Sequence, residues 1–356
     1  MPKSFVRVRV FPDAWRLHLD LPGDRLKAAF VQAGLAPASP DGQTPFTPSA
    51  DAVARYVGER VSAKSDDGRP WRVRVVAVQP PSGKVDEWRA DVALTPPAGP
   101  APEAVRLHYE VIGREIATHS AIVSLDQDWA RGLLPQSARL IGALRANDVD
   151  IRITRANGGL GGSLLGMVML GARHILEGAD HLAFLLVLLL SAPLVAEAGH
   201  WRPQPRARSV LGSAATRVSA FTVGHSFSLL AVSLGWLPAS GQKIEVLIAV
   251  SVAVTAVHAL RPIFPRREAW IAGGFGLIHG MAFATAIRDL SLSSGQVVAA
   301  TLCFNLGIEI VQLAIVLAVT PLLLLWRRWR WEWVVRSLLA AIALIFALIW
   351  IAQRLA

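Results

Sequence analysis

Long apolar segments with almost no charge fill the second half of this chain, and they constrain its fold more than any other feature. Residues 160–356 hold only 15 Lys and Arg and 8 Asp and Glu. A helix needs about 20 residues, most of them apolar, to cross the hydrocarbon core of a bilayer. Breaks rich in Pro, Gly and Arg divide this half into six stretches of that order, which predict six membrane spans. The predicted spans cover residues 163–191, 213–236, 244–261, 269–288, 296–325 and 334–353.

Arginines in the short connections predict how the spans are oriented. Nine of them follow the first, third and fifth spans, namely Arg202, Arg206, Arg208, Arg261, Arg266, Arg267, Arg327, Arg328 and Arg330. The connections on the opposite side hold only Lys243 and Arg288. Because cytoplasmic loops carry the excess of Lys and Arg, we expect a multi-pass protein of the inner (cytoplasmic) membrane with residues 1–159 outside the cytoplasm. That placement requires an export signal, so we expect a signal peptide upstream of Met1.

Residues 1–159 predict a β-rich, sandwich-like domain. Their charges are dense and nearly balanced, with 21 Lys and Arg against 18 Asp and Glu. Short β-branched segments alternate in part and are separated by turn residues, which favours strands at 4–11, 71–79, 88–95, 105–112 and 118–125. One helix is predicted at 50–61, after Ser49. The fold class is therefore two-part: a β-rich domain over 1–159, then a polytopic α-helical membrane bundle of about six transmembrane helices over 160–356.

The composition excludes several classes of protein. The formal net charge of +10 suggests a nucleic-acid binder, but long apolar runs separate the Arg clusters, whereas nucleic acid requires dense cations along a solvated face. Cys303 is the single cysteine and lies in an apolar span, which favours a packing role. The chain has no Walker A pattern, so no nucleotide is expected as a direct energy source.

Ionisable side chains at membrane depth are costly and mark candidate functional sites. The densest group lies in the first predicted span, where His174, Glu177 and His181 are spaced i, i+3 and i+7 and Asp180 lies at the edge of that face. Imidazoles and carboxylates on one helical face suit a divalent transition metal. The alternative is a set of buried hydrogen bonds and ion pairs between helices; four such groups within eight residues favour the metal site.

The other spans add candidates at a similar depth. Near the middle of their spans lie His225, His279 and Glu309, which with His181 predict a site at the bilayer midplane, where transport substrates bind. Further polar residues are predicted to support the site or form a pathway: Asn305, Gln312, Thr222, Ser226 and His258. Interhelical hydrogen bonding is the alternative for Asn305, Glu309 and Gln312. A satisfied core histidine stays an equal alternative for His225 and His279, and His258 is interpreted as an exit relay or a packing residue.

Taken in order, these segments resemble the HupE/UreJ family of membrane proteins. The matching stretches are GARHILEGADHLAFLLVLLL, FTVGHSFSLLAVSLG, IEVLIAVSV, GFGLIHGMAFA and FNLGIEIVQL. The resemblance carries His174, Asp180 and His181 over by the His-x5-Asp-His signature, and His279 by its His-Gly position. Shorter family members continue after that His-Gly with a His-Glu pair, where this chain has Met281-Ala282-Phe283-Ala284. The first part of the chain looks like the extra extracytoplasmic domain of the longer members.

The resemblance implies permeation of nickel or cobalt. The residues themselves predict a passive or proton-coupled permease whose metal site uses His174, Glu177, Asp180, His181, His225, His279 and Glu309. The metal is Ni²⁺ or Co²⁺ by preference, with Zn²⁺ as the alternative. Expected partners are the lipid bilayer, the metal ion and metal-handling accessory proteins, with no nucleic acid.

Two other functions stay open at this point. One is a membrane-embedded metal-dependent hydrolase, in which His174, Glu177 and His181 hold Zn²⁺ while Asp180 or Glu309 acts on water. It ranks lower because the chain lacks the His-Glu-x-x-His arrangement of the metalloproteases. The other is a non-transporting metal-binding anchor or sensor. Because the permease ranks first, we expect the chain not to be an enzyme.

Overall fold

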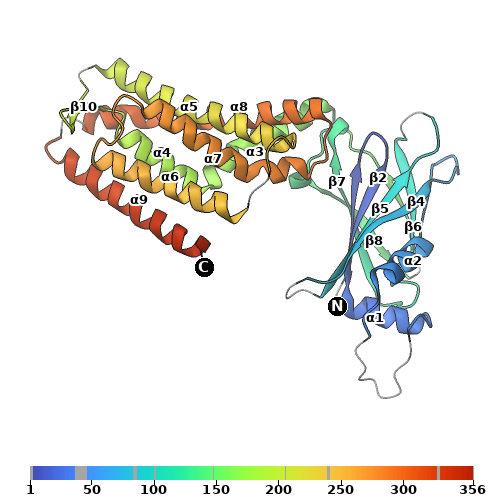
Figure 1. Cartoon of the computed structure of the whole chain (residues 1–356). Coiled ribbons are helices and arrows are strands. Elements are labelled where there is room, and N and C mark those ends of the chain that lie inside the picture. The colour runs from blue at the N-terminus through green and yellow to red at the C-terminus, as the bar shows by residue number, and fades with distance from the viewer. Residues whose placement is uncertain are drawn as a thin grey trace. The chain divides into compact units, whose positions relative to one another are not determined.

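The computed structural model describes residues 3–36, 46–82, 86–99, 102–146, 148–204, 206–238, 241–326 and 329–355. The chain divides into two compact units, Met1–Ser163 and Leu164–Ala356. The first is rich in strands and the second is helical, as the two halves of the sequence predict (Figure 1).

Two sheets form the strand-rich unit. The larger has the order β4-β5-β2-β1-β7-β8, in which β1 runs parallel to β7 and every other pair is antiparallel. The smaller has the order β3-β6-β9 and is antiparallel. The strands are β1 (Ser4–Val10), β2 (Trp15–Pro22), β3 (Val61–Lys64), β4 (Arg72–Gln79), β5 (Glu87–Thr95), β6 (Ala104–Tyr109), β7 (Ser120–Asp128), β8 (Arg139–Arg145) and β9 (Asp150–Thr154).

One hydrophobic core joins the two sheets to two helices. Val8 and Leu17 from the larger sheet, Leu107 from the smaller one, Phe30 from α1 (Gly23–Gln32) and Tyr56 from α2 (Ala50–Arg60) all belong to it. The shared core is what a sandwich-like arrangement requires, because each sheet buries one face against the other elements. Two short 3-10 helices follow β7, η1 (Trp129–Arg131) and η2 (Pro135–Ser137).

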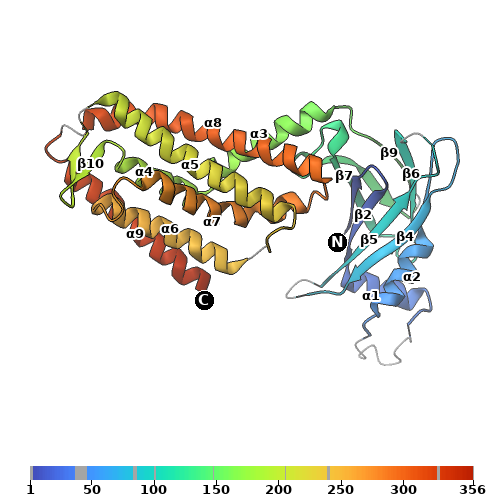
Figure 2. The same ribbon diagram turned by 45° about the horizontal axis from the view of Figure 1, so that its top comes forward.

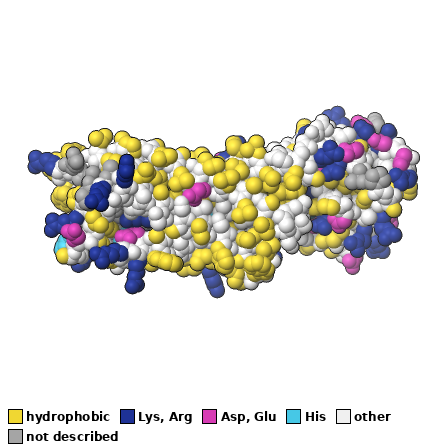
Figure 3. Space-filling model, turned by 90° about the horizontal axis from the view of Figure 1, so that it is seen from above, with side chains coloured by type: hydrophobic (Ala, Val, Ile, Leu, Met, Phe, Trp, Pro, Cys, Tyr) yellow, Lys and Arg dark blue, Asp and Glu magenta, His cyan; other side chains and the backbone are white. Residues whose placement is uncertain are grey.

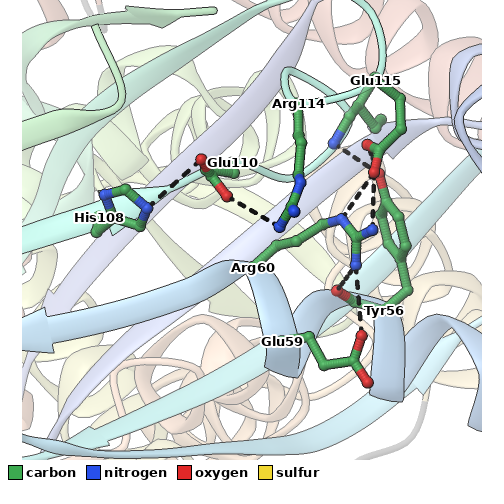
Figure 4. Close-up of polar contacts among 8 residues, drawn as sticks. Tyr56, Glu59, Arg60, His108, Glu110, Arg114 and Glu115 are labelled. Carbon is green, nitrogen blue, oxygen red and sulfur yellow. Dashed lines mark hydrogen bonds and ion pairs between the residues drawn. The ribbon is translucent and has the colours of Figure 1, made fainter. Parts of the chain in front are cut away.

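Helix α2 forms where the sequence predicts it. The Ser49 hydroxyl accepts a hydrogen bond from the Ala52 N–H at 3.2 Å, which caps the first turn. At its other end Arg60 donates to the Glu115 carboxylate at 2.7 Å, and both side chains are buried (Figure 4). A buried ion pair of this kind needs further hydrogen bonds, and Tyr56 donates one to Glu115 at 2.6 Å.

The loop after β6 depends on the same tyrosine. The strand predicted for 105–112 ends at Tyr109, and in the turn that follows Ile112 has a φ of 67°. A β-branched residue is strained in that region, and the Ile112 N–H is held by the Tyr56 hydroxyl at 3.0 Å. Burial and the Glu115 hydrogen bond raise the pKa of Tyr56, so its hydroxyl stays protonated and keeps donating.

Seven helices and one hairpin are described after residue 159. They are α3 (Leu160–Glu177), α4 (Ala179–Leu190), the hairpin β10 (Leu194–Glu197) and β11 (His200–Pro203), α5 (Ala207–Ser233), α6 (Gln242–Leu260), α7 (Glu268–Arg288), α8 (Ser294–Trp326) and α9 (Glu332–Leu355). Within the described residues, α6, α7, α8 and α9 are long and apolar enough to cross a membrane. Helix α4 is apolar but only 12 residues long. Each of the six predicted spans falls on helix, and the first falls on two.

Glycines let the helices approach at backbone distance. A Cβ added to Gly224 of α5 would lie 2.0 Å from the Gly273 carbonyl oxygen of α7, and one added to Gly280 would lie 2.2 Å from the His225 carbonyl oxygen. Gly171 of α3 lies equally close to α8, since its Cβ would be 1.9 Å from the Phe304 carbonyl oxygen. Small residues at such crossings are typical of membrane helices. Figure 2 shows α5 lying alongside α7 and α8.

The surface of the helical unit is apolar. Large exposed side chains such as Leu165, Leu302, Leu325 and Ile345 point outward, and Figure 3 shows hydrophobic side chains spread over this unit. Exposed arginines lie in the hairpin and in the connection between α6 and α7, which share one end of the unit in Figures 1 and 2. Arg327 and Arg328 lie outside the described residues. This distribution suits lipid around the helices.

Candidate metal centre

Three histidine side chains from three helices meet inside the helical unit. His174 lies near the end of α3, His181 in the first turn of α4 and His225 in α5. One ring nitrogen of each lies within 4.8 Å of the other two. His181 and His225 are buried and His174 is half-buried. Over the described ranges, this is the one group of His, Cys, Asp or Glu side chains close enough to share a metal ion.

A helix break brings His181 next to His174. The single helix expected over residues 163–191 is wrong, because α3 ends at Glu177 and Gly178 is extended, with φ −81° and ψ 99°. A Cβ at Gly178 would lie 2.7 Å from His181 Nδ1 and 2.8 Å from the His174 carbonyl oxygen, so the turn requires glycine. The ring centroids of the two histidines are 4.5 Å apart. Glu177, predicted on the same face, is exposed and lies outside the three-histidine group.

Asp180 orients His181. Its Oδ1 accepts from the His181 backbone N–H at 2.9 Å and lies 3.0 Å from the ring Nδ1. An ionised carboxylate only accepts, so His181 carries its proton on Nδ1 and leaves Nε2 bare. This is the arrangement of a carboxylate behind a metal-binding histidine. The structure thus places Asp180 behind His181, outside the three-histidine group.

Asn305, in α8, orients His225 in the same way as Asp180 orients His181. Its amide nitrogen donates to the Thr301 carbonyl oxygen at 2.8 Å, which identifies the other amide atom as the oxygen. That oxygen lies 2.9 Å from His225 Nδ1 and can only accept. His225 therefore holds its proton on Nδ1, and its bare nitrogen is Nε2.

His279 of α7 lies beside the group, with its ring centroid 5.1 Å from that of His181. The Ser251 hydroxyl donates to the Ile248 carbonyl oxygen at 2.7 Å, so toward His279 Nε2, 2.9 Å away, it accepts. The proton of His279 is therefore on Nε2 and its bare nitrogen is Nδ1. His279 is buried but lies outside the group of three.

Four buried histidine nitrogens have no hydrogen-bond partner among the described residues. They are Nε2 of His174, His181 and His225, and Nδ1 of His279. A buried polar atom left unpaired costs about 1–3 kcal/mol, so four together need a reason. Imidazole binds first-row divalent metals with bonds of about 2.0–2.1 Å. Nitrogens within 4.8 Å of one another can close on one such ion with small movements.

Aromatic rings wall the group. His174 packs on Phe283 at 4.6 Å and on Phe304 at 5.4 Å between ring centroids. Phe283 stacks on Phe304 at 4.5 Å, and Phe221 meets His279 at 5.1 Å. These rings make that side of the histidine group apolar. Phe283 belongs to the Met281-Ala282-Phe283-Ala284 stretch and contributes a ring here.

A second polar layer joins α5 to α8 and includes the remaining predicted residues of those helices. The Ser219 hydroxyl donates to Glu309 Oε1 at 2.5 Å, and the Thr222 hydroxyl lies 2.8 Å from Gln312 Oε1. Ser226 bonds the Thr222 carbonyl oxygen at 2.7 Å. Glu309 Oε2 is buried without a hydrogen-bond partner in the described part of the chain. This layer is not part of the three-histidine group.

His258 belongs to a different cluster. Its Nδ1 accepts from the Ile263 N–H at 3.2 Å, its ring stacks on Phe264 at 3.8 Å, and its Nε2 lies 4.0 Å from Glu268. The same carboxylate lies 3.8 Å from Arg217, a buried guanidinium that donates to the Ser191 hydroxyl at 2.8 Å. These contacts support the packing interpretation of His258.

Sequence reasoning missed several of these residues. Arg217 lies inside a predicted span, where an ionisable residue is itself a signal. Arg354 lies 3.6 Å from Asp180 although 174 positions separate them, and Ser219 carried no pattern that pointed to Glu309. Only the tertiary structure brings those pairs together.

Comparison with known proteins identifies a family for the helical part of the chain. The family described as HupE / UreJ protein matches residues 152–354, which covers the whole helical unit up to the last turn of α9. No curated protein and no solved structure matches the chain at a significant level. The matched family is associated with nickel and cobalt transport. Because the match covers more than half of its residues, the chain belongs to the HupE/UreJ family.

Proposed function

We propose that this chain is an integral membrane permease for a divalent transition metal, with Ni²⁺ the first candidate and Co²⁺ the second. The observation that carries the proposal is the group formed by His174, His181 and His225, whose ring nitrogens lie within 4.8 Å of one another. Imidazole suits nickel, copper and zinc, and the family narrows the choice to nickel or cobalt. Zn²⁺ stays the alternative cargo.

The neighbouring residues supply negative charge, which neutral imidazoles lack. Two carboxylates provide this charge near the histidines. Asp180 lies behind His181, and Glu309 lies in the polar layer between α5 and α8. They offset the charge of a dication without binding it directly, which lowers the cost of removing the ion from water. The ion exchanges part of its water shell for ring nitrogens and moves on when water returns.

The proposal includes a place for the protein in the cell. Apolar helices compatible with a bilayer and the arginines at one end of the helical unit favour the inner membrane, with those arginines in the cytoplasm. The strand-rich unit then lies outside the cytoplasm. Metal-handling accessory proteins remain the expected partners.

A hydrolase is less well supported. That function assigns Glu177 as a metal ligand and Asp180 or Glu309 to water, yet Glu177 is exposed and Asp180 is bonded to His181. We therefore propose a protein that is not an enzyme. A permease moves metal across the membrane and a non-transporting sensor does not, so a transport measurement distinguishes the two.

Metal uptake tests the proposal. Cells that express the chain should accumulate radioactive nickel faster than cells with an empty vector. His181→Ala and His225→Ala should reduce uptake to the vector level at equal protein abundance, because each removes one of three ligands. His200→Ala is the matched control, since His200 is exposed in β11, where its ring bonds the nearby Ala198 carbonyl oxygen. Full uptake by the His181 variant contradicts the proposal, and binding without uptake favours the sensor.

A further inference from the structure

Arg354, in the last turn of α9, is held between two carboxylates. Its guanidinium lies 3.6 Å from Asp180 Oδ2 and 3.6 Å from Glu245 Oε2. It also donates to the Glu245 carbonyl oxygen at 3.0 Å, and its own carbonyl oxygen accepts from Gln242 at 2.6 Å. The first turn of α6 thus anchors the arginine, and Asp180 is its second anionic partner.

Asp180 connects this arginine to the metal centre. Its Oδ1 faces the His181 ring and its Oδ2 faces Arg354, so one carboxylate is shared by a candidate metal ligand and a cation. The side chains of Asp180 and Arg354 are 20% and 23% exposed. They therefore lie at a partly exposed edge of the site, whereas His225 and His279 are buried.

We propose that Arg354 is a positioning residue that sets the metal affinity of the histidine group. With no metal bound, its guanidinium neutralises Asp180. When a dication binds His181, it repels Arg354, and the guanidinium moves onto Glu245. This inference rests on the proposed function, because it assumes that the histidine group binds a metal.

Electrostatics favour this exchange. A doubly charged ion beside His181 attracts Asp180 and repels the guanidinium behind it. Arg354 is already equally distant from both carboxylates, so the transfer is short and needs no movement of α9. The backbone hydrogen bond to Glu245 keeps the arginine attached during the transfer.

A purely structural role predicts something different. If Arg354 only links α9 to α6, its removal would lower thermal stability and would leave the metal affinity unchanged or weaker. As a competitor for Asp180, it lowers affinity, so its removal must tighten binding. The two roles therefore differ in the sign of the change in Kd.

Calorimetric titration of the purified full chain in detergent with NiCl₂ tests the proposal. Arg354→Gln should bind about fivefold tighter, the size expected for loss of one partly exposed ion pair. Arg354→Lys keeps the charge and should stay close to wild type. Glu245→Gln removes the second partner and should bind about threefold more weakly, by the same reasoning. Arg330→Gln is the control, since Arg330 is exposed in the connection before α9.

The Asp180→Asn background makes the test specific. Arg354→Gln should tighten binding less there than in wild type, because the contact with Asp180 is lost and only the direct repulsion of the ion remains to be relieved. Equal or weaker binding by Arg354→Gln, or an effect as large in Asp180→Asn as in wild type, overturns the role of Arg354 while the permease stands. If wild type binds no divalent metal, both proposals fall. Should Arg354→Gln not fold, Glu245→Gln decides the question: weaker binding than wild type supports the role of Arg354, and equal or tighter binding overturns it.

Discussion

At the scale of single residues, the candidate metal centre is defined by where each imidazole carries its proton. Asn305, Asp180 and Ser251 each leave their histidine with one bare nitrogen. The sequence predicts the histidines as candidate ligands, because ionisable groups stand out in apolar spans. It does not predict the proton positions, since these depend on contacts such as the one between Asn305 and Thr301.

The hydrogen bond from His225 to Asn305 should control metal affinity. Asn305→Leu removes the acceptor and frees the ring to rotate or change tautomer, so nickel should bind at least about tenfold more weakly, as for other residues behind metal ligands. Asn305→Asp keeps an acceptor and is the matched control. Calorimetric titration of both variants checks the prediction, and unchanged affinity in Asn305→Leu contradicts it.

His119 should make the strand-rich unit less stable in mild acid. Burial, aided by the charge of Arg25, lowers the pKa of His119 to about 4, and the ring lies 2.8 Å from the Ser4 hydroxyl. The unfolded chain binds the proton near pH 6.5, so the stability is complete above that pH and is lost as the pH falls toward 4. At pH 5 the loss is about 2 kcal/mol.

Hydrogen exchange of β1 and β7 amides in the full chain measures this loss. Protection should fall between pH 7 and pH 5 beyond the change in intrinsic exchange rate. His119→Gln has no ionisable ring and should show little of that fall. An equal fall in both proteins would assign the effect to another group.

At the scale of elements, two features shape the metal centre: a helix break and glycine crossings. The sequence predicts one continuous first span, because His174, Glu177 and His181 fit one helical face over an apolar run. The break at Gly178 depends on contacts of that residue with His174 and His181, which only the folded chain forms. Gly276 and Gly280 of α7 pack directly on α5, since a Cβ on either would meet the α5 backbone.

Gly224 should be intolerant of any side chain. Its Cβ would lie 2.0 Å from the Gly273 carbonyl oxygen, so Gly224→Ala must push α5 from α7 and move His225, one residue away. Overpacking of this kind costs about 1–3 kcal/mol. Gly212→Ala on the same helix meets nothing within 4 Å and should be neutral or stabilising by up to about 1 kcal/mol.

Thermal unfolding and nickel titration of these two variants in detergent check the prediction. Gly224→Ala should lower both the Tm and the affinity, and Gly212→Ala neither. A Gly224→Ala protein as stable as the Gly212 variant would show that the crossing adapts.

At the scale of the whole molecule, the density of charged residues along the chain is enough to separate the two units. The sequence predicts strands at β1, β4, β5, β6 and β7 and the helix α2, and the structure confirms them. It misses β2, although Arg16, His18 and Asp20 alternate there with apolar residues as in a half-buried strand. This strand pairs with both β1 and β5. It also misses β9, which is only five residues long and is defined by its pairing with β6.

A candidate site with three imidazoles has a consequence for how long a metal ion would stay there. A small dication accepts more than three donors, so one held only by His174, His181 and His225 keeps part of its own hydration. Its remaining waters can be replaced or regained one at a time, without stripping the ion in a single costly step. A complete set of protein ligands would hold a metal ion for a long time. An incomplete set, with phenylalanine rings on one side, favours short binding and release of the ion.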